Sequence, residues 1–175
     1  MSQDNADTHK QRLLTGQSDL ALYTNPLSLC AGEIINFHVL GKYSTEPLKL
    51  DIQLRGQGAI LYSSPSPVYP SKKPLSPNPY AVGCMADVSA SLSIPMDWAS
   101  GIYVATFKSP DGEIKTDVPF VVRSPRIAPS HSPPVLVVLP LATMNAYNKW
   151  GGASSYASEF PKDFPYIKSW TQITF

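Results

Sequence analysis

The sequence predicts a mainly β fold: an antiparallel, immunoglobulin-like β-sandwich, followed by a proline-rich linker and by the first strand and loop of an incomplete α/β domain. Three observations support this prediction. Apolar and polar residues alternate with a period of two in several segments between residues 20 and 124, as in strands that bury one face. Proline accounts for 18 of 175 residues and charged residues for only 15%, which is typical of short strands and turns. One later segment is apolar at every position, as in a strand covered on both faces.

The clearest alternation lies in residues 48–54, where leucine and isoleucine alternate with lysine, aspartate and glutamine. This pattern predicts a half-buried strand with Asp51 on its polar face. Residues 35–39 alternate in the same way and place His38 on the polar face, where we expect an exposed side chain. A third alternation predicts a strand in residues 86–94, with Val88 among the buried residues.

Two further strands are predicted at residues 102–107 and 116–122. Residues 109–112 between them read Ser-Pro-Asp-Gly, and both proline and Asp-Gly favour a tight hairpin turn. No helical period interrupts this series, so the strands are expected to form one antiparallel sandwich.

Two proline-rich stretches divide the chain. Residues 63–82 contain six prolines, which cannot donate to a sheet, so we expect an extended loop or edge segment there. Its role is open between a spacer and a binding loop that uses Tyr69 and Tyr80. The second stretch has the composition of an interdomain linker. The expected organisation is a flexible tail (1–18), a β-sandwich domain (19–124), a linker (125–134) and the N-terminal fragment of an α/β catalytic domain (135–175).

Charge and hydropathy narrow the function classes. The net charge is +1 and there is no long basic run, so we expect no nucleic-acid partner. The longest apolar run is five residues, far below the about 20 needed to cross a bilayer, so we expect no membrane association. The first residues lack the apolar core of a secretory signal, which predicts a cytoplasmic protein.

Residues 135–139 form the segment that is apolar throughout. A strand of this kind needs covering layers on both faces. The sandwich, another chain or further sequence could supply them, and we expect one of the last two. The residues after such a strand are informative, because ligands of open α/β sheets bind beyond the carboxyl ends of the strands. Here they read Thr-Met-Asn-Ala-Tyr-Asn-Lys-Trp-Gly-Gly-Ala-Ser-Ser-Tyr from Thr143 to Tyr156. A surface turn that packs two domains together is the structural alternative.

This motif, with the preceding Leu-Pro, resembles the start of the catalytic domain in the large (β) subunit of N,N-dimethylformamidase and its relatives. Upstream, Trp98, Ser100, Gly101 and Tyr103 resemble the turn that enters a strand in the sandwich domain of that family. The resemblance implies a hydrolase that acts on the carbon–nitrogen bond of small amides and holds iron through two tyrosines and a glutamate. It implies Tyr147 as an iron ligand, with Thr143 and Asn148 as residues that position it.

The family's catalytic domain is much longer than the matching segment, so the remaining ligands are expected elsewhere. We therefore expect this chain alone to be inactive, as a truncated gene product, a split subunit or an excised fragment. Another protein chain or an oligomer is the expected partner of this part of the enzyme.

The alternative is a freestanding sandwich module that binds a carbohydrate or a protein. Tyr69, Tyr80 and Trp98 would then be the contact residues. Trp98 at a strand entrance is more often part of the core than a sugar platform.

Overall fold

The computed structural model describes residues 20–41, 46–73, 85–112, 115–124, 138 and 140–147. The strands belong to one of two compact units and the single described helix to the other. No helix among these residues has the length and apolar character needed to cross a membrane.

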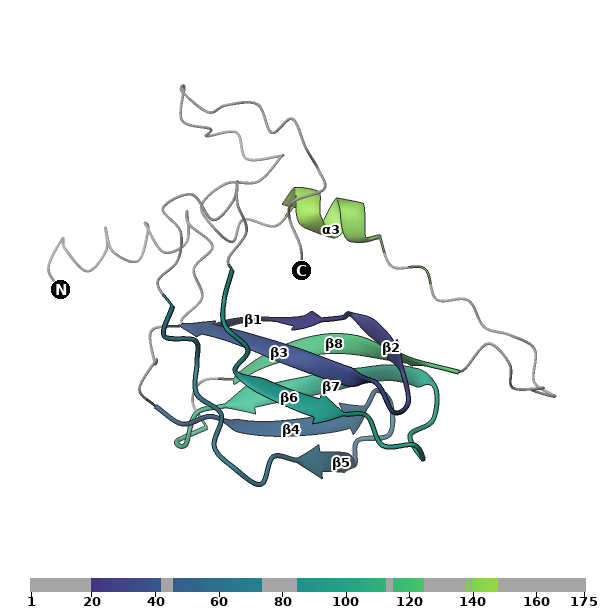
Figure 1. Ribbon diagram of the computed structural model, residues 1–175, viewed down its shortest axis with the longest axis horizontal. Helices are drawn as coiled ribbons and strands as arrows, with labels where there is room; N and C mark the ends of the chain where they lie inside the picture. The colour runs from purple at the N-terminus through teal and green to yellow at the C-terminus, as the bar shows by residue number, and fades with distance from the viewer. Residues whose placement is uncertain are drawn as a thin grey trace, which may run out of the picture. The chain divides into compact units, whose positions relative to one another are not determined.

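The strands form two sheets, a three-stranded one in the order β1-β3-β6 and a five-stranded one in the order β2-β8-β7-β4-β5. Figure 1 shows them as two stacked layers. The strands are β1 (Leu20–Asn25), β2 (Ser28–Cys30), β3 (Ile34–Gly41), β4 (Lys49–Leu54), β5 (Ile60–Ser63), β6 (Ala90–Ser93), β7 (Gly101–Lys108) and β8 (Lys115–Arg123). The predicted β-sandwich is therefore confirmed.

Aromatic side chains from both sheets meet in the core. Phe37 of β3 contacts Phe107 of β7 and Phe120 of β8 edge to face, with ring centroids 5.7 and 6.2 Å apart. All three residues are fully buried. Such edge-to-face pairs add to the free energy gained from apolar burial, so they hold the two sheets together.

The chain passes from one sheet to the other between β1 and β2, next to a cis peptide bond at Asn25–Pro26. β1 pairs antiparallel with β3, whereas β2 pairs in parallel with β8. The strands β1, β2 and β5 were not predicted individually. Three to six residues with mixed polarity give too weak a periodic signal for a prediction.

The five predicted strands are present as β3, β4, β6, β7 and β8. β7 and β8 pair antiparallel along their whole length, and the Gly112 amide donates to the Ser109 carbonyl at 2.9 Å in the turn. Strand β6 starts only at Ala90, and Val88 is 50% exposed. The prediction that Val88 is buried was wrong, because the chain before Ala90 is not part of the sheet.

The immunoglobulin-like character of the sandwich stays a prediction that one local feature favours. The Tyr103 hydroxyl at the start of β7 donates to the Ala99 carbonyl at 2.8 Å, which is the arrangement called a tyrosine corner in immunoglobulin-type domains. Trp98 stacks on the Tyr103 ring at 4.6 Å. Leu54 occupies the space beside Gly101, where an added Cβ would lie 2.7 Å from the leucine Cδ1. The Trp-x-Ser-Gly-x-Tyr motif therefore builds this corner.

The first part of the proline-rich segment is an edge segment. Val68 forms an isolated antiparallel bridge with Leu48, and their backbone groups exchange hydrogen bonds of 2.7 and 2.9 Å. Residues 74–82 lie outside the described residues, so Tyr80 does too, while Tyr69 is 48% exposed.

The second unit contributes helix α3 (Leu141–Tyr147). The motif was expected to lie in a loop. Leucine, methionine and two alanines favour a helix, however, and the preceding Pro140 suits a helix start. Of the predicted strand at 135–139, only Val138 is described; it lies in no strand and is 76% exposed.

Candidate functional site

Helix α3 carries two of the three predicted site residues. Thr143 and Tyr147 are four residues apart, so they lie on the same face of the helix. Thr143 is exposed, and Tyr147 is 61% exposed. Ala146 points in a different direction and is 5% exposed. The helix thus presents a hydroxyl and a phenol one turn apart, while a small residue is buried.

Asn148 lies outside the described residues, so its predicted position next to Tyr147 stays a prediction. The residues from there to Tyr156, which complete the motif, also lie outside. What the structure adds is the helical spacing of Thr143 and Tyr147.

The described residues can be tested against the iron centre that the resemblance implies. They contain no group of three histidine, cysteine, aspartate or glutamate side chains that could hold a metal ion. Tyr147 supplies one oxygen donor of the type that iron(III) prefers. Tyr147 is therefore the residue of the motif that could fill one position of the implied centre of two tyrosines and a glutamate.

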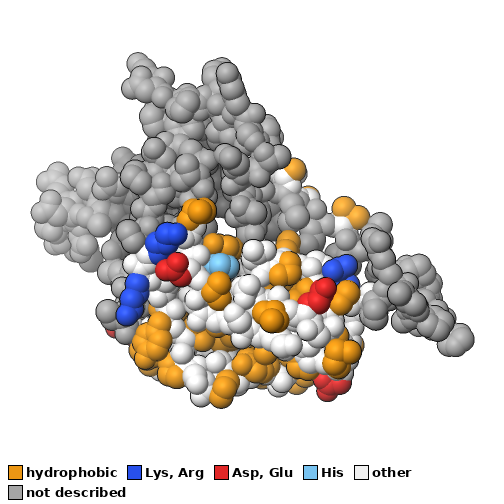
Figure 2. All heavy atoms as spheres, in the orientation of Figure 1, with side chains coloured by type: hydrophobic (Ala, Val, Ile, Leu, Met, Phe, Trp, Pro, Cys, Tyr) orange, Lys and Arg blue, Asp and Glu red, His pale blue; other side chains and the backbone are white. Residues whose placement is uncertain are grey.

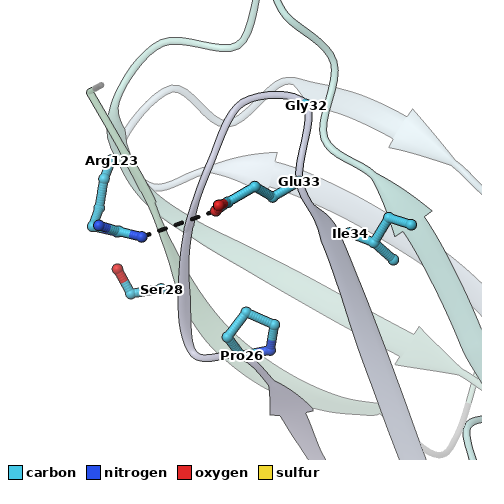
Figure 3. Close-up of a pocket in the computed structure, with 6 residues that line it drawn as sticks. All are labelled: Pro26, Ser28, Gly32, Glu33, Ile34 and Arg123. Atoms are coloured by element: carbon cyan, nitrogen blue, oxygen red, sulfur yellow. Dashed lines mark ion pairs between the residues drawn. The ribbon is translucent and has the colours of Figure 1, made fainter. Parts of the chain in front are cut away.

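A shallow pocket lies in the sandwich unit, with a volume of about 640 Å³. Figure 3 shows its lining residues, which come from the β1–β2 connection, the first residues of β2 and β3, the loop between these two strands and the end of β8. They are Pro26, Ser28, Gly32, Glu33, Ile34 and Arg123. The polar groups of the lining are the hydroxyl of Ser28, the carboxylate of Glu33 and the guanidinium of Arg123.

Glu33 and Arg123 give this pocket its charge. One carboxylate oxygen of Glu33 accepts a hydrogen bond of 2.6 Å from the Cys30 amide, which fixes the carboxylate inside the loop. Arg123 lies 3.9 Å from the same oxygen, and its side chain is 48% exposed. This long, exposed ion pair contributes little to stability, so the guanidinium can bind another anionic group.

His38 is buried rather than exposed, contrary to the sequence prediction. It is 9% exposed, and its ring stacks on Tyr23 with centroids 4.4 Å apart. Its Nδ1 lies 3.0 Å from the Ala86 carbonyl and 3.2 Å from the Asp87 carbonyl. Since carbonyls only accept, Nδ1 carries the proton. The histidine thus joins the segment before β6 to β3.

The outer face of the five-stranded sheet holds a row of polar residues that was not predicted from the sequence. Asp51 is only 4% exposed, although it lies on the polar face of β4. The Ser63 hydroxyl donates to its carboxylate at 2.6 Å, and the ammonium groups of Lys49 and Lys108 each lie 3.3 Å from one of its oxygens. Strand pairing brings these residues together, and sequence spacing alone contains no signal for it.

The surroundings of Asp51 act on its pKa in opposite directions. Burial alone would raise it, but the hydrogen bonds from Ser63, Lys108 and Lys49 outweigh burial and hold the pKa of the carboxyl below its ordinary value of 3.8. Asp51 is therefore a charged, buried anchor for two lysines.

Trp98 belongs to the core periphery. It is partly buried, packs against the hydrophobic core and has one ring face against Tyr103. The interpretation of Trp98 as part of the core is confirmed. Only the ring face that does not contact Tyr103 could stack on a sugar.

The fold and these sites define a class of protein: a β-sandwich unit joined in one chain to a second unit that presents a tyrosine from a short helix. Residues 54–174 match the family described as N,N-dimethylformamidase beta subunit-like, C-terminal, and the chain belongs to that family. The matched region runs from the end of β4 through β8 and includes α3. No curated protein matches the chain.

Proposed function

We propose that this chain is part of an amide hydrolase that cleaves the carbon–nitrogen bond of small amides such as N,N-dimethylformamide. One observation carries the proposal. The family match extends through the helix that presents Tyr147, and the phenol of that residue is exposed on the same helix face as Thr143.

In this proposal Tyr147 is one ligand of an iron ion. The phenol of a free tyrosine has a pKa of about 10, and a bound cation favours its ionised form. Thr143, one helical turn earlier, is placed to position the phenol, and Asn148 follows directly in the sequence. When bound, iron would supply Lewis acidity toward the amide carbonyl.

One phenolate does not form a metal site, so Tyr147 must act together with donors outside the described residues. We therefore propose that the isolated chain does not retain stoichiometric iron when it is purified without an added chelating ligand, and that it does not hydrolyse amides. The sandwich unit then has a structural role.

The experiment uses iron(III) nitrilotriacetate, a chelate that leaves coordination positions open, as a probe added to the purified chain. We expect a saturable visible absorption band, typical of an iron–phenolate complex, that Tyr147→Phe removes. The control is Tyr69→Phe, which changes a tyrosine of comparable exposure in the sandwich unit and should leave the band unchanged.

Equal loss of the band in both variants, or no change in Tyr147→Phe, would overturn the role of Tyr147. The same samples are assayed for release of dimethylamine from N,N-dimethylformamide. We expect no release, and hydrolysis by the chain alone would refute the proposed inactivity.

A further inference from the structure

The pocket of Figure 3 contains one full charge of each sign. Arg123 lies 3.9 Å from one carboxylate oxygen of Glu33, and their side chains are 48% and 57% exposed. A hydrogen bond between nitrogen and oxygen is about 2.7–3.2 Å long, so this contact is an ion pair without a good hydrogen bond. A guanidinium has several N–H donors and a carboxylate has several lone pairs. Both groups therefore keep the capacity to bind a further molecule.

The loop that carries Glu33 is tied down by hydrogen bonds on both sides. The Gly32 amide donates to the Ile94 carbonyl at 2.8 Å, and the Ile94 amide donates to the Glu33 carbonyl at 2.9 Å. The Glu33 amide donates to the Cys30 carbonyl at 3.2 Å, and the Cys30 amide donates to the Glu33 carboxylate at 2.6 Å. Since a charge that is already positioned loses little freedom when a ligand arrives, this arrangement lowers the entropy cost of binding.

Strand register places Ser28 and Arg123 on the same side of the sheet. Cys30 pairs with Arg123 in the parallel β2–β8 ladder, and Ser28 is two residues earlier on β2. The intervening residues, Leu29 and Val122, are buried in the core, so their neighbours point outward. A hydroxyl and a guanidinium thus line the same pocket, and both can donate to a carboxylate.

Another part of the pocket wall is apolar. Ile34 is 58% exposed, although isoleucine is usually buried. Ile35, the next residue, is fully buried in the core, so the side chain of Ile34 points outward. Pro26 lines the same pocket. A ligand with an apolar group would cover Ile34 and gain the free energy of removing that surface from water.

The charges around the pocket do not favour a ligand of one sign. On the face that Figure 2 displays, charged side chains are few, basic and acidic ones lie close together, and hydrophobic side chains are scattered. The displayed face therefore has no field of one sign that would attract an anion or a cation over a long distance. A singly charged ligand would meet one attractive and one repulsive group in Glu33 and Arg123. A ligand with both charges close together aligns with the ion pair and is attracted by both groups.

We propose that the pocket binds a free α-amino acid with an apolar side chain. Its carboxylate accepts hydrogen bonds from Arg123 and Ser28, its ammonium group donates to Glu33, and its side chain covers Ile34. Both charged groups of an α-amino acid are attached to one carbon, a spacing that suits two protein groups 3.9 Å apart. The ion pair stays intact, because the ligand aligns with it and does not replace either member. The inference does not depend on the proposed hydrolase activity.

The experiment titrates L-leucine into the isotope-labelled full chain at low ionic strength and about pH 6.5, where an α-amino group is protonated. Backbone amide signals are followed by NMR, and we expect saturable shifts of the Gly32, Glu33 and Ile34 amides. N-acetylleucine lacks the positive charge and leucinamide lacks the negative charge, while both keep the side chain. Each should bind at least about three-fold more weakly than leucine, the effect of an exposed charge pair. Glycine has no side chain to cover Ile34 and should also bind more weakly.

Two variants should reverse the preference between the singly charged ligands. Glu33→Gln keeps an acceptor for the Cys30 amide but leaves Arg123 as the only charge of the pocket, so N-acetylleucine should bind more tightly than leucinamide. Arg123→Gln leaves only Glu33, so leucinamide should bind more tightly than N-acetylleucine. Both variants should weaken leucine binding at least about three-fold. The matched controls, Glu46→Gln and Arg55→Gln, change exposed side chains elsewhere in the sandwich unit and should leave all affinities unchanged.

The proposal is overturned if leucine causes no saturable shifts, if the pocket amides do not shift while others do, or if the singly charged ligands bind as tightly as leucine. It is also overturned if the two pocket variants weaken all three leucine ligands equally, since recognition of the ion pair requires opposite preferences in the two variants.

Discussion

Replacing Asp51 by asparagine tests whether a buried charge organises the outer face of the five-stranded sheet. The carboxylate accepts a 2.6 Å hydrogen bond from Ser63 and two lysine contacts of 3.3 Å. Hydrogen bonds to a charged group contribute about 1.5–3 kcal/mol, and ion pairs whose lysines are largely exposed add about 0.2–1 kcal/mol each. Asparagine keeps an acceptor for Ser63 but turns amide hydrogens toward the lysines. We expect a loss of about 2–3 kcal/mol in the free energy of unfolding.

The assay is urea unfolding followed by circular dichroism at several pH values. The pKa of Asp51 is lower in the folded state than its ordinary value of 3.8, so the unfolded state binds more protons and stability rises with pH. The contribution of Asp51 is fully present above about pH 3.8 and is lost as the pH falls through its folded-state pKa. The difference between wild type and Asp51→Asn should therefore be constant near pH 6 and shrink in acid.

Asp117→Asn is the matched control. Asp117 lies on the same face and accepts a 2.6 Å hydrogen bond from Thr106, with Lys115 at 3.6 Å. Its side chain is 47% exposed, so we expect a loss of less than about 1 kcal/mol. Equal losses for both variants, or a loss for Asp51→Asn that does not change with pH, would refute the reasoning from burial.

The remaining predictions concern local geometry. Tyr103→Phe should lower the free energy of unfolding in urea by about 1 kcal/mol, because it removes the 2.8 Å hydrogen bond to Ala99 and keeps the ring contacts. An unchanged urea midpoint would show that this hydrogen bond does not stabilise the fold. Gly32→Ala should cost about 1–2 kcal/mol, because Gly32 has a φ of +85° and an added Cβ would lie 3.0 Å from the sulfur of Met96. Gly58 has a φ of +70°, and an added Cβ there would meet no atom within 4 Å. Gly58→Ala should therefore cost a few tenths of a kcal/mol less than Gly32→Ala. In a Met96→Ala background the two glycine changes should cost the same free energy of unfolding. A difference that persists there would rule out the methionine contact as its cause.

Most of the sandwich could be predicted because its signals are local. The alternation in β4 and the Ser-Pro-Asp-Gly turn between β7 and β8 each depend on residues within one short segment. The short strands β2 and β5 escaped prediction because their place in the sheet depends on partners far along the chain. The helix at 141–147 escaped because a resemblance to a motif identifies residues and not their backbone conformation.

The candidate site was predictable only in part. The motif identified Thr143 and Tyr147, and their exposure on one helix face comes from the structure. The pocket beside Arg123 brings together residues about ninety positions apart, and no spacing rule could have connected them.

By itself the sequence determined which side chains share a face of each strand and which family the chain resembles, since alternation and motifs are local properties. Only the tertiary structure decided how deeply each face is buried. Asp51 and His38 both follow the polar half of an alternating pattern, yet both are buried. Strands and loops from elsewhere in the chain cover them, and the contacts that stabilise a buried polar group exist only after those segments have come together.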